Sequence, residues 1–211
     1  MNGAAISLCG VSVQLQDHIV VSDVTFETQE GQAIAIIGPN GAGKTTLVKA
    51  MLGLIPSQGS IIINGNVVKM GSPPSSVAYV PQKLEFDRSV PLAVKELFQA
   101  FVPRHTAGEM RQALERLGVE SLHRSMVSRL SGGQLQRVVI AMNLMLKPKV
   151  LFLDEPSTGI DAEGETHLYT LLRELCSQQK TSVVMVSHDL SVVSKYMDHV
   201  VCINKKMLCC A

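Results

Sequence analysis

The sequence has no apolar run long enough to cross a membrane. Its longest uninterrupted apolar stretches, such as Ala33–Ile37 and Val138–Met142, hold five residues, against about 20 in a membrane-spanning helix. Its first ten residues also lack the basic segment and the long apolar stretch of a secretory signal peptide. These absences predict a cytoplasmic chain that contacts a membrane only through a partner protein.

The sequence also lacks an excess of charge and a regular spacing of cysteines. It carries 19 basic and 18 acidic residues, a net charge of +1, whereas nucleic-acid-binding domains normally show a basic excess on one face. The five cysteines are an odd number without a C-x-x-C pair, which argues against a disulfide framework. We expect buried, reduced thiols; the alternative is a metal site among Cys202, Cys209 and Cys210.

The composition that is present is that of a globular protein. Of the 211 residues, 46% are hydrophobic and 18% are charged, enough for a substantial core. The first part of the chain reads as strands in the segments "AISLCGVSV", "HIVVSDVTFE", "QAIAIIG" and "GSIIING", with one helix in "KTTLVKAMLGL". After Pro148 the chain alternates strand "VLFL", a helix from about 163 to 178, strand "SVVMVS", a short helix and strand "HVVCI". This alternation predicts a parallel sheet covered by helices.

The middle of the chain has a helical pattern from residue 92 to about residue 128. Met110, Ala113, Leu114 and Leu117 follow the i, i+3, i+4, i+7 spacing of one helix face. A block of helices inside a strand-rich chain predicts an inserted helical lobe within a single domain of residues 1–211. The expected fold class is therefore α/β, with a strand-rich N-terminal part, a parallel-sheet core and this lobe.

The segment "GPNGAGKTT" satisfies the phosphate-loop motif G-x-x-x-x-G-K-[ST], and it stands between a predicted strand and a predicted helix. Its glycines allow backbone N–H groups to curl around phosphates at a helix N-terminus. Lys44 is expected to reach the β- and γ-phosphates, and the Thr45 hydroxyl to bind Mg²⁺. The expected nucleotide-binding residues of this segment are Gly38, Pro39, Asn40, Gly41, Ala42, Gly43, Lys44, Thr45 and Thr46.

Polar side chains follow two further apolar strands. Asp154 and Glu155 end "VLFLDEP", at the carboxyl edge where open α/β sheets bind ligands. Asp154 is expected to hold Mg²⁺ and Glu155 to polarise the water that attacks the γ-phosphate. His188 follows "VMVS" and is expected near the γ-phosphate, while Gln82 in "AYVPQ" is expected to contact Mg²⁺ or the attacking water.

The segment "LSGGQLQR", residues 130–137, contains no acid, histidine or cysteine that would serve as a base or a metal ligand. Ser131 and the N–H groups of Gly132 and Gly133, at a helix start, are nevertheless suited to hold a phosphate. Together "GPNGAGKTT", "YVPQ", "LSGGQLQR", "VLFLDEP", "STGID" and "VSHDL" resemble, in sequence and order, the ATP-binding cassette of ABC transporters. The resemblance covers essentially the whole chain and implies the fold of that family, a RecA-like parallel-sheet core with an N-terminal antiparallel β subdomain and an inserted α-helical lobe.

The resemblance implies which phosphate the segment "LSGGQ" binds. In that family this segment completes the phosphate site of a facing subunit, so that Ser131, Gly132, Gly133 and Gln134 would serve the ATP of a partner chain. Asp161 in "STGID" would lie at the seam of that dimer, and it is also placed to cap the helix that follows. The implied cofactors are ATP and Mg²⁺, and residues 83–133 would be the helical lobe that carries this segment.

Within the family, "YVPQKLEFDRSVPLAVKELF" and "DEPSTGID" look most like the ATPase subunits of bacterial high-affinity zinc importers, with manganese and iron importers as close relatives. The implied partners are a second cassette, an integral membrane permease and, indirectly, an extracytoplasmic metal-binding protein, and the implied location is the cytoplasmic face of the inner membrane. The permease groove is expected between Gln82 and the lobe, around Phe86, Phe98 and Phe101. The alternatives are a cassette ATPase of DNA repair or translation and a metal sensor.

One position departs from the family pattern. Family members usually place an aromatic ring against adenine in a strand turn well before the phosphate loop, where this sequence offers Leu15. His18 is a nearby substitute ring if the turn presents it inward. We therefore expect the phosphates to hold the nucleotide, with weak discrimination between ATP and GTP.

Overall fold

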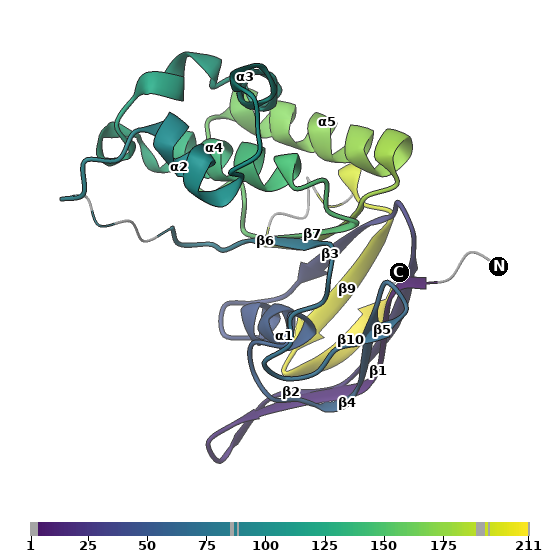
Figure 1. Cartoon of the computed structure of the whole chain (residues 1–211). Helices are drawn as coiled ribbons and strands as arrows, with labels where there is room; N and C mark the ends of the chain where they lie inside the picture. The colour runs from purple at the N-terminus through teal and green to yellow at the C-terminus, as the bar shows by residue number, and fades with distance from the viewer. Residues whose placement is uncertain (1–3, 85–86, 88, 189–192, 194, 211) are drawn as a thin grey trace.

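The computed structural model describes residues 4–84, 87, 89–188, 193 and 195–210, and its strands form a single sheet in the order β5-β4-β1-β2-β10-β9-β3-β8-β7-β6 (Figure 1). The strands are β1 (Ala4–Leu15), β2 (His18–Gln29), β3 (Ala33–Ile37), β4 (Gln58–Ile63), β5 (Asn66–Val67), β6 (Val77–Val80), β7 (Val150–Asp154), β8 (Ser182–Ser187), β9 (His199–Asn204) and β10 (Lys206–Cys210). The helices are α1 (Lys44–Met51), α2 (Val94–Phe101), α3 (Ala107–Glu115), α4 (Gly132–Met145) and α5 (Ala162–Gln179), with 3₁₀ turns η1 (Glu120–Arg124) and η2 (Val127–Arg129). No helix among the described residues is long and apolar enough to span a membrane.

The parallel part of the sheet consists of β9, β3, β8, β7 and β6. Alternate residues of each strand pack on opposite faces. In β8, for example, Val184 and Val186 pack with α1, whereas Val183 and Met185 pack with the helices α2 to α5. Because both faces are covered, these strands appear in the sequence as unbroken apolar runs. The predicted α/β fold with a parallel-sheet core is confirmed.

The predicted antiparallel β part is also present. Strand β1 pairs antiparallel with β2 and β4, and β4 pairs antiparallel with β5. Its apolar side chains, together with α1, form one continuous core with one face of the parallel strands.

The sequence does not predict β10, which joins the two parts into one sheet. It pairs antiparallel with β9 and parallel with β2, where Lys206 is opposite Ser22. In the turn before it, the Lys205 N–H donates to the Ala42 carbonyl at 3.1 Å, and the Lys205 carbonyl accepts from the Ser22 N–H at 2.7 Å. These hydrogen bonds hold β10 against segments more than 150 residues earlier in the chain. A short sequence pattern cannot predict such contacts.

The helices α2 and α3 arise from the segment with the helical pattern, and they lie beside α4 and α5 on one side of the sheet (Figure 1). Met110, Leu114 and Leu117 are buried, as their spacing predicts, and Ala113 is half-buried. Thr106 begins α3 with a capping box, since its hydroxyl accepts from the Glu109 N–H at 3.2 Å and the Glu109 carboxylate accepts from the Thr106 N–H at 2.8 Å.

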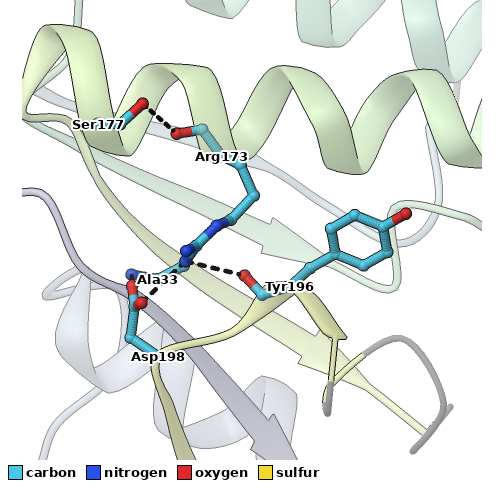
Figure 2. A network of polar contacts seen from close by, with 5 residues as sticks. All are labelled: Ala33, Arg173, Ser177, Tyr196 and Asp198. Atoms are coloured by element: carbon cyan, nitrogen blue, oxygen red, sulfur yellow. Dashed lines mark hydrogen bonds and ion pairs between the residues drawn. The ribbon is translucent and has the colours of Figure 1, made fainter.

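A polar network ties α5 to the amino ends of β3 and β9 (Figure 2). The Arg173 guanidinium donates to Asp198 Oδ1 at 2.8 Å and to the Tyr196 carbonyl at 3.4 Å, and Asp198 Oδ2 accepts from the Ala33 N–H at 2.8 Å. Burial opposes ionisation of Asp198, but the Ala33 N–H and Arg173 outweigh it and hold the pKa of this carboxyl below its usual value.

We expect Asp198→Asn to lower the free energy of unfolding by about 1–2 kcal/mol at neutral pH, because the amide loses the charge-assisted bond to Arg173. The folded-state pKa of Asp198 is lowered from an unfolded value of about 3.9. Its stabilisation is therefore complete above that value and is lost as the pH falls through the folded-state pKa. Urea unfolding at a series of pH values should show a shallower acid loss in the variant than in the parent. Asp17→Asn, in an exposed turn, should behave like the parent.

Candidate nucleotide-binding site

The phosphate-loop segment connects β3 to α1 in a conformation that requires glycine. Gly38 and Gly43 have φ values of 155° and 97°, in the region that disfavours residues with a Cβ. A side chain at Gly38 would collide with the Ile203 carbonyl of β9, and one at Gly43 would collide with Val21 of β2. The glycines therefore serve both the loop curvature and its close packing on neighbouring strands.

A cavity of about 670 Å³ lies over this loop at the carboxyl edge of the parallel strands. It brings together every residue expected from the phosphate-loop segment and three that follow other strands. The lining residues are Val20, Gly38, Pro39, Asn40, Gly41, Ala42, Gly43, Lys44, Thr45, Thr46, Gln82, Glu155 and His188.

Lys44 opens α1 with its ammonium group turned back into the loop. The side chain is buried, and its Nζ donates to the carbonyls of Gly38 at 2.8 Å and Pro39 at 3.1 Å. Neutral carbonyls satisfy the hydrogen bonds of an ammonium group but do not neutralise its charge. A buried cation beside free helix-start N–H groups suits an anionic ligand such as a phosphate.

Asp154 ends β7 and contacts the start of α1. The Thr45 hydroxyl donates to Asp154 Oδ2 at 2.7 Å, while Asp154 Oδ1 is buried and accepts no hydrogen bond from any described residue. Burial raises the pKa of Asp154, the Thr45 hydrogen bond opposes the rise, and the neighbouring Glu155 carboxylate adds to it. A hydroxyl oxygen beside a carboxylate with an unused oxygen fits a hard divalent cation, which prefers oxygen ligands and would offset the cost of ionisation.

Gln82 and His188, expected at Mg²⁺ or the attacking water and at the γ-phosphate, both approach the carboxylate of Glu155, the residue expected to polarise the water. Gln82 Nε2 donates to Glu155 Oε2 at 2.6 Å, and His188 Nδ1 lies 3.6 Å from Glu155 Oε1. Glu155 has a φ of 47°, which is uncommon for any residue other than glycine. This backbone conformation stores strain in the turn after β7. Its side chain is only 14% exposed, whereas that of His188 is 69% exposed. Glu155 is thus the fixed member of the group.

The segment "LSGGQLQR", residues 130–137, called the signature segment from here on, lies outside this cavity. Ser131 begins α4 in a capping box with Gln134: its hydroxyl accepts from the Gln134 N–H at 3.2 Å, and its N–H donates to Gln134 Oε1 at 3.0 Å. Ser131 and Gly132 are exposed, while Gly133 packs so closely on the backbone of Gly159 that any side chain would collide with it. Residues 131–134 therefore place a helix N-terminus outside the phosphate-loop cavity of their own chain.

Asp161 begins α5, and its Oδ1 accepts from the Gly164 N–H at 3.0 Å. The predicted capping role is confirmed. Asp161 too lies outside the lining of the phosphate-loop cavity, so its role at a dimer seam stays a prediction.

Comparison with known proteins decides which family combines these features. The family model described as ABC transporter matches residues 21–158, from β2 to the turn after β7. The chain belongs to the ABC transporter family. It is an ATP-binding cassette, a nucleotide-binding ATPase.

Two relatives align with almost the whole cassette. It is 39% identical over 206 residues to the zinc import ATP-binding protein ZnuC 1 of Hahella chejuensis, an alignment that covers 98% of the cassette and 76% of the relative. It is 40% identical over 210 residues to the zinc import ATP-binding protein ZnuC of Pseudomonas syringae pv. syringae, covering 99% and 77% of the two chains.

Solved structures share the fold of the cassette. The ADP conformation of the ATP-binding cassette MJ1267 superposes with a TM-score of 0.84 at 20% identity, over 99% of the cassette and 91% of that chain. The ATP-binding subunit of an ABC transporter superposes with a TM-score of 0.85 at 25% identity, over 98% and 89%.

The sequence did not point to Val20 as a lining residue of the cavity. Leu15 and His18, the candidates for contact with the base, are exposed at the β1–β2 turn and do not line the cavity, whereas Val20 on β2 does. Only the register of β2 against the phosphate loop identifies it, because its side chain lies beside Gly43.

We expect Val20→Ala to weaken ATP and GTP binding alike, by up to about fifteenfold, because removing two methyl groups costs about 0.8 kcal/mol each when they are fully covered. Leu15→Ala is the matched control and should change neither affinity. Titration of the cassette with fluorescent ATP and GTP analogues measures both. A loss specific to ATP would assign recognition of the base to Val20. A loss only in Leu15→Ala would assign contact with the base to the β1–β2 turn instead.

Proposed function

We propose that the cassette is the ATP-hydrolysing subunit of a membrane importer that carries zinc into the cell. The observation that carries the proposal is one cavity lined by the phosphate loop, Glu155 and Gln82, with Asp154 hydrogen-bonded to Thr45 of that loop, in a cassette about 40% identical to zinc import ATP-binding proteins. Residues 1–211 would act as one ATP-binding domain, with residues 83–133 as its helical lobe, at the cytoplasmic face of the inner membrane.

The nucleotide would be held through its phosphates. Residues 38–46 would supply backbone N–H groups, and Lys44 would exchange its two carbonyl partners for phosphate oxygens. Thr45, Asp154 and Gln82 would hold Mg²⁺, which when bound offsets negative charge on the phosphates.

Glu155 would orient the attacking water and accept its proton, since its carboxylate is held between Gln82 and His188. His188 would bind the γ-phosphate from the exposed side of the cavity. Because Gln82 touches Glu155 and leads into the lobe, it would transmit the state of the nucleotide to the lobe.

A complete site would need a second copy of the cassette. Ser131, Gly132, Gly133 and Gln134 have their helix-start N–H groups outside their own cavity, so they would close on the γ-phosphate held by the partner chain. In a two-fold dimer each chain contributes both halves, and Asp161 would lie between the two sites.

The permease would bind over the groove between Gln82 and the helical lobe. A cavity of about 410 Å³ lies there, lined mainly by apolar side chains such as Leu84, Leu92 and Leu130. Of the phenylalanines expected around it, Phe98 is a core residue and Phe101 is 58% exposed, neither of them lines the cavity, and Phe86 lies outside the described residues. An extracytoplasmic metal-binding protein would deliver the metal to the permease, and no nucleic acid would take part.

Metal uptake in the cells of origin tests the proposal. Cells carrying only Lys44→Ala should lose energised uptake of radioactive zinc and grow poorly when zinc is chelated, while parent cells take it up. Lys49→Ala, on the exposed side of α1, is the matched control and should behave as the parent. Loss of manganese or iron uptake with zinc uptake intact would assign a different metal, and no change in any uptake would remove the transport role.

A further inference from the structure

Two cysteines are opposite each other in the last pair of strands. Strands β9 and β10 lie side by side (Figure 1), and Cys202 on β9 is the register partner of Cys209 on β10 in their antiparallel ladder. Such partners have Cα atoms about 4.5–5.5 Å apart and side chains on the same face of the sheet. A disulfide joins residues whose Cα atoms lie about 4.4–6.8 Å apart. The backbone therefore already holds this pair at a distance that a disulfide can span.

The two thiols differ in access to solvent. Cys209 is exposed and Cys202 is partly exposed, so the expectation of buried thiols fits Cys176 but is wrong for Cys9, Cys209 and Cys210. Burial, together with the Cys209 thiol beside it, raises the pKa of Cys202 to about 11. A reagent in solution reaches Cys209 first, while Cys202 is a protonated neighbour.

The third cysteine of the segment does not complete a metal site. Cys210 is opposite Val201, one position along the ladder, so its side chain lies on the other face from Cys209. Within the described part of the chain, no three His, Cys, Asp or Glu residues are grouped so that they could hold a metal ion. The pair is thus a dithiol rather than part of a larger ligand cluster.

The pair adjoins the phosphate loop. Ile203 follows Cys202 directly, and its carbonyl occupies the space that a Gly38 side chain would need. The turn after β9 also donates the Lys205 N–H to Ala42. A disulfide would draw the two Cβ atoms from about 4.5–5.5 Å to about 3.8 Å, and the shift of β9 would act on the loop through these contacts.

We propose that Cys202 and Cys209 form a reversible disulfide by exchange with a low-molecular-weight disulfide, and that this bond weakens nucleotide binding at the phosphate loop. The Cys209 thiolate attacks one sulfur of the small disulfide, forms a mixed disulfide and releases one small thiolate. Cys202 then gives its proton to solvent, attacks the Cys209 sulfur and releases the second small thiolate. Two protein thiols are oxidised and one small disulfide is reduced to two thiols. The effect on binding rests on the proposed nucleotide site.

Oxidation of the whole chain with glutathione disulfide tests the inference. Intact mass should fall by two hydrogens, peptide mapping should find the Cys202–Cys209 cross-link, and ATP should bind at least about fivefold more weakly, or about 1 kcal/mol. Dithiothreitol should restore both. Cys210→Ser, the matched control, should respond as the parent does, whereas the ATP affinity of Cys202→Ser should be insensitive to the oxidant.

A cross-link between Cys209 and Cys210, a mixed disulfide that goes no further, or a cross-linked chain with unchanged ATP affinity would each overturn the inference. Peptide mapping needs no nucleotide, so failure of the bond to form counts against the dithiol alone. A reduced chain that binds no ATP would instead overturn the proposed function.

Discussion

ATP hydrolysis by the Glu155→Gln variant should fall by about 10²–10⁴-fold, the contribution of a positioned general base. The amide keeps the shape of the side chain and an oxygen for the Gln82 Nε2–H, but it cannot accept a proton from the attacking water. ATP affinity should stay within about twofold of the parent, since we expect the phosphates to contact the loop and Lys44. Phosphate release and ATP titration measure the two quantities.

The same variant should accumulate an ATP-bound dimer, because the closed state would no longer be released by hydrolysis. Size-exclusion chromatography with ATP and Mg²⁺ detects it. Glu174→Gln is the matched control. The Glu174 side chain is 48% exposed, its carboxylate is 3.8 Å from the Arg116 guanidinium, and it does not line the phosphate-loop cavity. Turnover should therefore not change. If Glu155→Gln hydrolyses ATP within a few-fold of the parent, Glu155 is not the base.

Ser131→Arg should abolish hydrolysis while leaving the ATP affinity of the monomer unchanged. Ser131 lies outside the cavity of its own chain, and an arginine there would block the approach of the partner's phosphate loop. The substitution also removes the cap of α4, which costs about 1 kcal/mol of stability. Thr106→Arg removes the equivalent capping box of α3 and is the control for that loss: it should destabilise the chain equally and still hydrolyse ATP.

Mixing Ser131→Arg with Lys44→Ala separates action on the partner from action within one chain. In a mixed dimer, the intact phosphate loop of the first chain faces the intact signature segment of the second, so one working site is restored. Hydrolysis above that of either variant alone supports the shared site. Loss of ATP affinity in the Ser131→Arg monomer itself would place residue 131 in its own chain's site and contradict the dimer.

Most of the nucleotide site could be predicted because its signals are local. The glycines of the phosphate loop are required by the φ values of the loop itself, which spans only a few residues. Asp154, Glu155 and His188 each follow a strand whose unbroken apolar run is visible in the sequence. Parallel strands share one carboxyl edge, so the alternation of strands and helices was enough to predict that these side chains meet. The cap at Asp161, which the sequence also predicted, is local in the same way.

What the sequence could not decide depends on pairing between distant segments. The strand β10, the carbonyl of Ile203 against Gly38, the place of Val20 in the cavity and the opposition of Cys202 and Cys209 each require the register of strands far apart in the chain. Backbone hydrogen bonds carry no side-chain signature, and a shift of one residue would reverse which face every side chain occupies. The sequence by itself determined which chemistry the chain carries, and the tertiary structure decided which side chains surround it, because register is fixed only when the whole sheet is assembled.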